Sequence, residues 1–427
     1  MIEISIFQSW LAKGLGRAAV FLNEHDASPY LDTLLYACTH NLTYDTPFED
    51  ERTPYLWRLV ELSKQQAFFR DEVWRHLTEE LDYPDEYEWS QLFGLARRFA
   101  VQGDAEIRRA MYSAFERLGF EKAGELPAQE FIELDGLDGF VFVAERFDLA
   151  HPEDELWKIE SLVSDLEERL GKEQNSELLN KLAHRNQKVA SVLDAVQQQE
   201  LKYAEQRAKA QFKAIPDYFT LKAQKADRSW AAQLQRWAAT ATPEQINVAA
   251  DDLLWETDAE KLWGFLRAFS RRPFPGSPER LLELAADERP RIRGAAVVAL
   301  SNVSHPQVRS RALVLLHSAD RFADGARLLV SNYEPGDFHL LEDLLRRPIP
   351  EDICHDLGFS IENILGRQLT PEAEGSLLLL YENNPCSSCR ERFVRFLIDL
   401  NRMPGWMREE CRYDANADTI KAVLQAE

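Results

Sequence analysis

The chain has 427 residues, of which 45% are apolar, as expected for two or three folded domains or one elongated array. Its net charge of -22, from 50 basic and 72 acidic residues, disfavours general nucleic-acid binding and favours basic partners. Five cysteines, an odd number, argue against a secreted disulfide framework, and no stretch approaches the ~18 uninterrupted apolar residues of a membrane span. We therefore expect a cytoplasmic protein without a membrane segment.

The first segment, MIEISIFQSWLAKGLGRAAVFL, does not have the pattern of a secretion signal. It lacks a basic n-region, and Lys13 and Arg17 interrupt its apolar run. Its glycine-rich stretch, KGLGR (13–17), lacks the G-x4-G-K-[ST] pattern of a phosphate loop. We expect a loosened turn or a helix break there.

A polar cluster follows in CTHNLTYDTPFEDER, residues 38–52, which we expect to connect two helices. His40 with Asp45 and Glu49 could perform acid–base chemistry, because the surroundings can tune the pKa values of all three groups. Asp45-x-Pro47 is also good turn chemistry, and connections are polar in any protein. A loop with internal hydrogen bonds is the favoured interpretation, with His40 and Asp45 kept as candidate binding residues.

The spacing of the apolar residues is helical almost throughout. In residues 104–118, Ile107, Met111, Phe115 and Leu118 form one stripe, with Asp104 as a plausible N-cap and Gly119 as a stop. Similar patterns predict helices at residues 29–41, 53–63, 68–81, 90–103, 322–333, 337–347, 372–383 and 388–401. The one candidate for strands, residues 132–147, is equally consistent with a buried helix, which we prefer.

Residues 172–228 differ from the rest of the chain. They contain no glycine, one proline, and eleven Lys and Arg against seven Asp and Glu, a net charge of +4. Leu182, Val189, Leu193 and Val196 form a roughly heptad stripe that fades afterwards, which predicts a coiled-coil-like helical hairpin or a spacer. Three lysines, Lys202, Lys209 and Lys213, fall on one helical face and are candidate binding residues.

Two similar units follow each other in residues 286–318. Pro290-Arg-Ile-Arg293 and Pro306-Gln-Val-Arg309 each precede small and apolar residues, with proline in the expected first turn of a helix. This pattern resembles the second-helix signature of HEAT repeats, and 286–318 would be about one repeat. The resemblance implies antiparallel helix pairs stacked into a curved rod, and it carries no catalytic residues.

The recurring Arg293 and Arg309 could line a groove for an acidic partner. A ladder with acidic neighbours such as Asp287 and Glu288 is the better interpretation, because recurrence follows from the repeat itself. Trp230 and Trp237, seven residues apart, are a candidate contact surface beside the insertion.

The thiol pair Cys386 and Cys389 has C-x2-C spacing, which supplies half of a structural zinc site. Cys411 is a candidate third ligand, and Cys354 or His355 could complete a Cys3His set. A redox pair is the second interpretation, because a helix N-terminus would lower the pKa of the Cys386 thiol. In the third and favoured one, Ser387 or Ser388 caps a helix and Cys389 is a small buried apolar residue.

Together these features predict an all-α, HEAT-like α-solenoid with a long charged helical insertion. We divide it into an N-terminal helical array (1–150), the insertion (151–230) and a C-terminal array (231–427). Helical arrays leave long faces for contact, so we expect a non-catalytic scaffold that binds a protein partner, with no cofactor. The acidic net charge leads us to expect a basic partner.

Two other functions remain open at this stage. One is a metal- or thiol-dependent enzyme, or a zinc-stabilised module, built on Cys386 and Cys389. The other is nucleic-acid contact through the basic insertion, which the overall charge disfavours.

Overall fold

The computed structural model describes residues 2–79, 83, 86–149, 156–211 and 215–426, with the backbone alone at 208–211. Over these residues the chain is helical and contains no strand, which confirms the predicted all-α, solenoid-like fold. Within the same residues, no helix combines the length and the apolar character needed to cross a bilayer.

The chain divides into two compact units. Unit 1 comprises residues 1–212 together with 405–425, and unit 2 comprises residues 213–404. Unit 1 is thus discontinuous in sequence, and unit 2 is inserted into it. The predicted three-part division, with boundaries near 150 and 230, stays a prediction.

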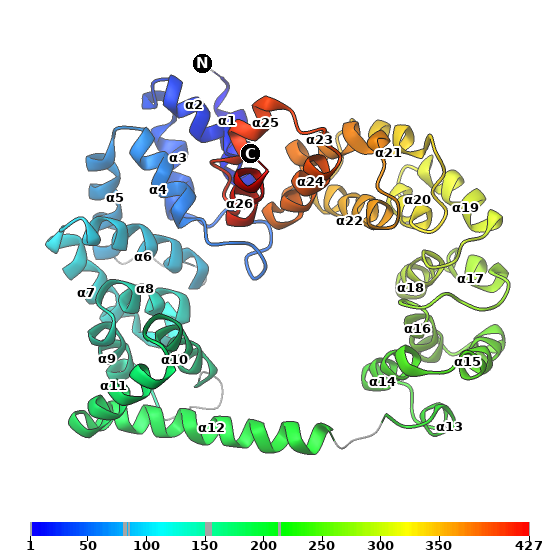
Figure 1. Cartoon of the computed structure of the whole chain (residues 1–427), viewed down its shortest axis with the longest axis horizontal. Helices are drawn as coiled ribbons and strands as arrows, with labels where there is room; N and C mark the ends of the chain where they lie inside the picture. Colours follow the sequence, from blue (N-terminus) through cyan, green and yellow to red (C-terminus); the bar gives the residue numbers. More distant parts are fainter. Residues whose placement is uncertain (1, 80–82, 84–85, 150–155, 212–214, 427) are drawn as a thin grey trace. The chain divides into compact units, whose positions relative to one another are not determined.

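Unit 1 is a stack of helices, most of which pack on neighbours one to three places along the chain, as in a solenoid (Figure 1). Its helices are α1 (Ile4–Lys13), α2 (Arg17–Glu24), α3 (Leu31–Thr39), α4 (Thr53–Leu62), α5 (Gln66–Thr78), α6 (Glu86–Val101), α7 (Ala105–Ala123), α8 (Glu125–Asp135), α9 (Leu137–Arg146), α10 (Leu156–Leu170), α11 (Lys172–Arg185), α12 (Gln187–Gln211), α25 (Gly405–Cys411) and α26 (Ala417–Gln425). The apolar core is rich in aromatic rings. Phe93, Phe115 and Phe131, all fully buried, meet edge to face with ring centres 5.1–6.4 Å apart.

Two details of α7 confirm the sequence interpretation. The carboxylate of Asp104 accepts hydrogen bonds from the backbone N–H groups of Glu106 and Ile107, as an N-cap does. Gly119, with φ of 73°, interrupts the helix. Residues 132–147 are also helical, as preferred, and belong to α8 and α9.

The KGLGR stretch is a helix break. Gly14, with φ of 67°, ends α1, and its carbonyl accepts a hydrogen bond of 2.9 Å from the N–H of Ala415. A Cβ at Gly16 would collide with the carbonyl oxygen of Glu410. The two glycines therefore allow the C-terminal segment to lie directly against the break.

The apolar stripe of the insertion fades along α12 as predicted. Val189, Val192 and Val196 are buried against neighbouring helices, whereas every residue from Leu201 to Arg207 is exposed. The outer part of α12 thus extends past the packed helices of unit 1 (Figure 1).

Unit 2 is built of α13 (Tyr218–Lys222), α14 (Arg228–Thr240), α15 (Pro243–Trp255), α16 (Ala259–Ala268), α17 (Glu279–Leu284), α18 (Pro290–Leu300), α19 (Pro306–Leu316), α20 (Phe322–Leu329), α21 (Asp337–Leu345), α22 (Glu351–Arg367), α23 (Glu374–Asn383) and α24 (Ser387–Asp399). The even-numbered helices α14, α16, α18, α20, α22 and α24 pack in that order as one layer, leaving α21 and α23 packed together outside it (Figure 1). Helices α15, α17, α19 and α23 each pack on the next helix of this layer.

The repeat expected at residues 286–318 is only partly present. Pro290 and Pro306 do open helices, α18 and α19. The tightly packed pairs, however, are α17 with α18 and α19 with α20. The repeat boundary therefore falls between the two proline-started helices instead of enclosing them, and HEAT stays a resemblance.

Candidate functional site

An acidic pocket lies in unit 1, between the polar loop 41–52 and helices α6, α8 and α10. Its volume is about 390 Å³. The residues around it are Asn41, Thr43, Thr46, Pro47, Glu49, Asp50, Glu51, Arg52, Glu86, Tyr87, Ser90, Gln91, Glu125, Leu126, Gln129, Glu130 and Trp157. Six of them carry carboxylates and one carries a guanidinium.

The loop that forms one wall is held by its own hydrogen bonds, as the favoured interpretation expected. Asn41 Oδ1 accepts a bond of 3.0 Å from the N–H of Thr43, and the N–H of Asp45 donates to Glu49 Oε1 at 2.9 Å. Glu49 Oε2 also pairs with Arg52 Nη2 at 3.0 Å, and both side chains of this pair are almost fully buried. The guanidinium of the pocket is thus already engaged by one of its carboxylates.

Two of the remaining carboxylates, Glu125 and Glu130, are in an environment that resists negative charge. Burial, reinforced by the charge of Glu51, raises the pKa of Glu130 to about 7 in spite of its contact with Arg97. Burial also raises the pKa of Glu125, with Glu86 and Asp165 as further contributors. These carboxylates would be stabilised by an additional cation.

The opposite edge of the pocket is aromatic. The Trp157 side chain is 49% exposed at the start of α10. Next to it, the ammonium of Lys158 lies 5.8 Å from the Trp157 ring centre and 3.6 Å from Glu86 Oε2. One ammonium of the chain itself is therefore already bound between a carboxylate and an aromatic face here.

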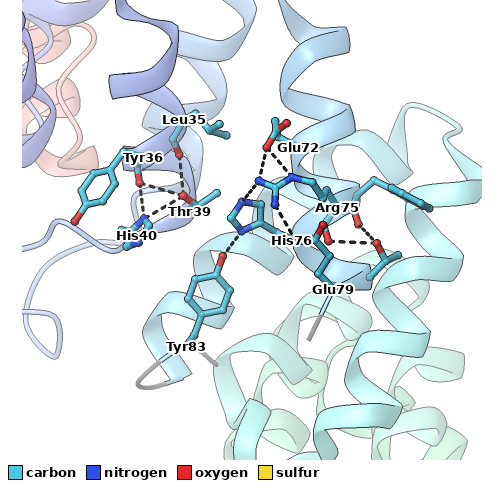
Figure 2. Close-up of polar contacts among 11 residues, drawn as sticks. Leu35, Tyr36, Thr39, His40, Glu72, Arg75, His76, Glu79 and Tyr83 are labelled. Atoms are coloured by element: carbon cyan, nitrogen blue, oxygen red, sulfur yellow. Dashed lines mark hydrogen bonds and ion pairs between the residues drawn. The ribbon is translucent and has the colours of Figure 1, made fainter. Parts of the chain in front are cut away.

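His40 and Asp45 lie beside this pocket and not in its wall. The His40 ring stacks on Tyr36 at 4.0 Å, and its Nδ1 lies within hydrogen-bonding distance of the Tyr36 carbonyl (3.1 Å) and of Thr39 Oγ1 (3.1 Å) (Figure 2). These contacts end α3. The role of His40 and Asp45 in binding stays a prediction.

A second histidine lies near His40, and the sequence analysis missed it. The ring of Tyr83 is edge-on to His40 at 6.4 Å, and its hydroxyl is hydrogen-bonded to His76 Nδ1 (Figure 2). Burial and the charge of Arg75 lower the pKa of His76. His76 and Tyr83 are seven positions apart in the sequence. No known motif has this spacing, so the sequence did not indicate the pair.

The thiol pair lies in unit 2 at the start of α24. Cys386 is the N-cap residue and α24 begins at Ser387, so the expected capping by a serine side chain is wrong. Both cysteines are buried, at 4% and 5% exposure. Cys389 Sγ lies 3.2 Å from Nε2 of His355 on α22, and the donor atoms of His355, Cys386 and Cys389 all lie within 4.8 Å of one another.

The other cysteines considered as ligands are placed differently. Cys354, next to His355, is buried but lies outside this group of three. Cys411 is buried in α25 of unit 1. The hydrogen bond with Cys386, followed by burial, raises the pKa of the Cys389 thiol. The redox interpretation concerned the Cys386 thiol, and it stays a prediction.

Arg293 and Arg309 both make contacts within unit 2. Arg293 donates to the carbonyl oxygen of Asp287 at 3.0 Å. Arg309 donates to both carboxylate oxygens of Asp337, at 2.7 and 2.9 Å, and to the carbonyl of Asn332 at 2.7 Å. These bonds tie helix ends together, and the role of Arg293 and Arg309 in binding stays a prediction.

The remaining candidates are the lysines of the predicted insertion and the two tryptophans of α14. Lys202 is exposed on α12, Lys209 lies on α12 where the backbone alone is described, and Lys213 lies outside the described residues. Trp230 and Trp237 are buried at 2% and 4% exposure, so the expected tryptophan contact surface is wrong.

The comparisons with known proteins assign no family. No family model matches the chain, and no curated protein matches it. A crystal structure of SYS-1 aligns with 94% of this chain and 77% of its own, at 12% identity and a TM-score of 0.22. A crystal complex of SYS-1 and POP-1 aligns with 100% of this chain and 99% of the matched one, at 12% identity and a TM-score of 0.16. At such TM-scores neither likeness carries an argument about function.

Proposed function

We propose that the chain is a non-catalytic scaffold whose unit 1 binds a basic segment of a partner protein in the acidic pocket. The observation that carries this proposal is the pair of carboxylates with raised pKa values, half-buried Glu125 and buried Glu130, in a cavity of about 390 Å³. A lysine or arginine side chain of the partner would place a positive charge beside these carboxylates and favour their ionised form, which burial disfavours.

The shape and chemistry of the pocket suit a long cationic side chain. Leu126 and Trp157 offer apolar surface for its aliphatic stem, and the carboxylates of Glu86 and Glu125 can accept hydrogen bonds from its head. Arg and Lys over an indole face gain cation–π energy as well. Lys158, held between Glu86 and Trp157, is an internal example of the arrangement that we propose for the partner.

A groove in unit 2 has similar chemistry and supports a scaffold with more than one contact surface. It has a volume of about 700 Å³ and includes Asp251, Glu279 and Glu283. Trp255 at its edge is 85% exposed, an unusual position for so large an apolar side chain. We infer that this groove is a second docking point for the same class of basic partner.

The test uses fluorescence anisotropy with a labelled peptide of alternating Lys, Arg and Gly, against a peptide of the same length with Gln in place of Lys and Arg. The basic peptide should bind and the neutral one should not. Glu125→Gln and Glu86→Gln should each weaken binding by about tenfold, which is typical of a lost charge-assisted contact.

The control removes the same charge elsewhere in unit 1. Glu24 is exposed on α2, so Glu24→Gln should leave the affinity unchanged. Equal losses in Glu24→Gln and Glu125→Gln would mean that the peptide responds only to the net charge of -22, and the pocket proposal would be wrong.

A further inference from the structure

We infer that His355, Cys386 and Cys389 form a zinc site that joins α22 to α24 in unit 2. The site is independent of the acidic pocket, which lies in unit 1. It contains two thiol sulfurs and one imidazole nitrogen, the donor types that zinc prefers in proteins.

The distances fit a common metal ion. Zinc–sulfur bonds of ~2.3 Å and zinc–nitrogen bonds of ~2.0 Å at a tetrahedral angle place neighbouring ligand atoms roughly 3.5–3.8 Å apart. Here Cys389 Sγ and His355 Nε2 are 3.2 Å apart, and all three donor atoms lie within 4.8 Å of one another. Small rotations of the side chains would bring the three atoms onto one ion.

The backbone supports this convergence. Cys386 precedes the first turn of α24 and Cys389 lies within it, so the C-x2-C spacing points both sulfurs to one end of the helix. Asn384, fully buried, accepts a hydrogen bond of 3.1 Å from the N–H of Cys386 through Oδ1. The carbonyl of Cys386 accepts a bond from the N–H of Arg390, which starts the helix. The turn that carries Cys386 and Cys389 is thus held by hydrogen bonds without a bound metal.

His355 comes from the adjacent helix of the same layer. Helix α22 packs on α24, and the His355 ring contacts the Phe359 ring edge-on at 4.7 Å. An ion bound here would therefore crosslink two helices that are also joined by packing and by the ion pair of Arg392 with Glu362 at 2.8 Å. Three protein ligands leave one tetrahedral position for water or for a fourth side chain.

The burial of the two cysteines favours a bound metal ion over thiolates that have no cation beside them. The sulfurs come from side chains that are about 5% exposed, where an uncompensated thiolate would be very costly. Binding of a divalent cation displaces the thiol protons and neutralises both thiolates at once. The buried amide nitrogen of Asn384 has no hydrogen-bond partner in the described structure. It could donate a hydrogen bond to a negatively charged sulfur of the site.

The experiment titrates the reduced full-length protein with Co²⁺, followed by Zn²⁺. Tetrahedral thiolate coordination should produce intense visible cobalt bands and sulfur-to-cobalt charge transfer at about one equivalent, and zinc should abolish both. Elemental analysis after dialysis should find about one zinc per chain.

Two variants and a control make the outcome decisive. Cys389→Ser and His355→Gln should lose the cobalt spectrum or weaken binding at least about tenfold, whereas Cys38→Ala, a buried cysteine of unit 1, should retain it. His355 is only half-buried, so His355→Gln should stay folded by circular dichroism even if Cys389→Ser does not. A folded, reduced wild type that gives no cobalt bands, or His355→Gln with an unchanged spectrum and affinity, would overturn the zinc site.

Discussion

Arg17 and Glu410, 393 positions apart in the sequence, form an ion pair with 2.6 Å between Nε and Oε1. The guanidinium also lies over two indole rings, 5.8 Å from that of Trp10 and 5.4 Å from that of Trp406. This cluster attaches α25, from the C-terminal end, to α2. Together with the hydrogen bond from Ala415 N–H to the Gly14 carbonyl, it contributes polar contacts to the interface that completes unit 1.

We expect Glu410→Ala to destabilise unit 1 by about 1–3 kcal/mol, because it leaves a partly buried guanidinium without this carboxylate. Urea unfolding followed by tryptophan fluorescence measures the change. Lys181→Ala removes an exposed ion pair with Glu177 and should cost less than about 0.5 kcal/mol. Equal effects of the two substitutions would contradict a structural role for the Arg17 pair.

Asp104 combines an N-cap with an ion pair, so Asp104→Ala should cost about 1–3 kcal/mol. Asp71 contacts the same Arg70 but is exposed, and Asp71→Ala should cost little. The hydrogen bond from Arg70 lowers the pKa of Asp104 in the folded protein. The contribution of Asp104 to stability is therefore complete at pH values above its unfolded pKa, and it is lost as the pH falls through its folded pKa. Unfolding measured at decreasing pH should show this loss in the wild type but not in Asp104→Ala.

Glu130 should have the opposite pH dependence. Its folded pKa of about 7 lies above the unfolded value, so the folded state holds a proton that the unfolded state releases. Stability should fall as the pH rises from about 4.5 to 7, by an amount on the order of 3 kcal/mol if other groups are unchanged. Glu130→Gln removes this term, so the difference in unfolding free energy between variant and wild type should shift with pH. A constant difference from pH 5 to 8 would show that Glu130 titrates normally.

Binding of the basic peptide should strengthen with pH for the same reason. If the ionised form of Glu130 is the binding form, a pKa of about 7 makes the affinity about tenfold weaker at pH 6 than at pH 8. With its N-terminal amine blocked by the label, the peptide has no group that titrates in this range. Anisotropy at constant ionic strength gives the dependence, and Glu130→Gln should flatten it. A steep dependence that persists in Glu130→Gln would assign the proton to another residue.

Two glycines of unit 2 should respond in opposite ways to alanine. A Cβ at Gly264 in α16 would collide with the buried ring of Trp230, so Gly264→Ala should destabilise by roughly 1–3 kcal/mol. Gly294 in α18 has no atom within 4 Å of that position, and Gly294→Ala should stabilise by about 0.5–1 kcal/mol. Thermal unfolding separates the two. Destabilisation by Gly294→Ala would indicate that α18 packs more closely than described.

Local pattern predicted many of the helices, because their apolar stripes and end signals each lie within one stretch of sequence. Asp104 and Gly119 mark a start and a break within one stretch of sequence. Pairing of helices was harder. The similar starts at Pro290 and Pro306 suggested one repeat, whereas packing pairs each of them with a different neighbour. Such a choice depends on surfaces that are distant in sequence.

The candidate sites also depend on residues that are distant in sequence. The C-x2-C spacing identified Cys386 and Cys389, but His355 became the third member only through the packing of α22 on α24. The acidic pocket has no signature at all, because Glu51, Glu86 and Glu125 come from three separate elements. Trp157 likewise gave no sign in the sequence of being more exposed than the buried Trp230 and Trp237.

The discontinuity of unit 1 has a consequence during translation. Residues 405–425, including the segment that lies against Gly14, leave the ribosome only after all of residues 213–404 have been synthesised. The surface of α2 that packs on α25 is therefore exposed while residues 213–404 are synthesised and begin to fold. A nascent chain stalled before residue 405 would carry an unfinished first unit beside a complete second one, and it is at this stage that a chaperone would be needed most.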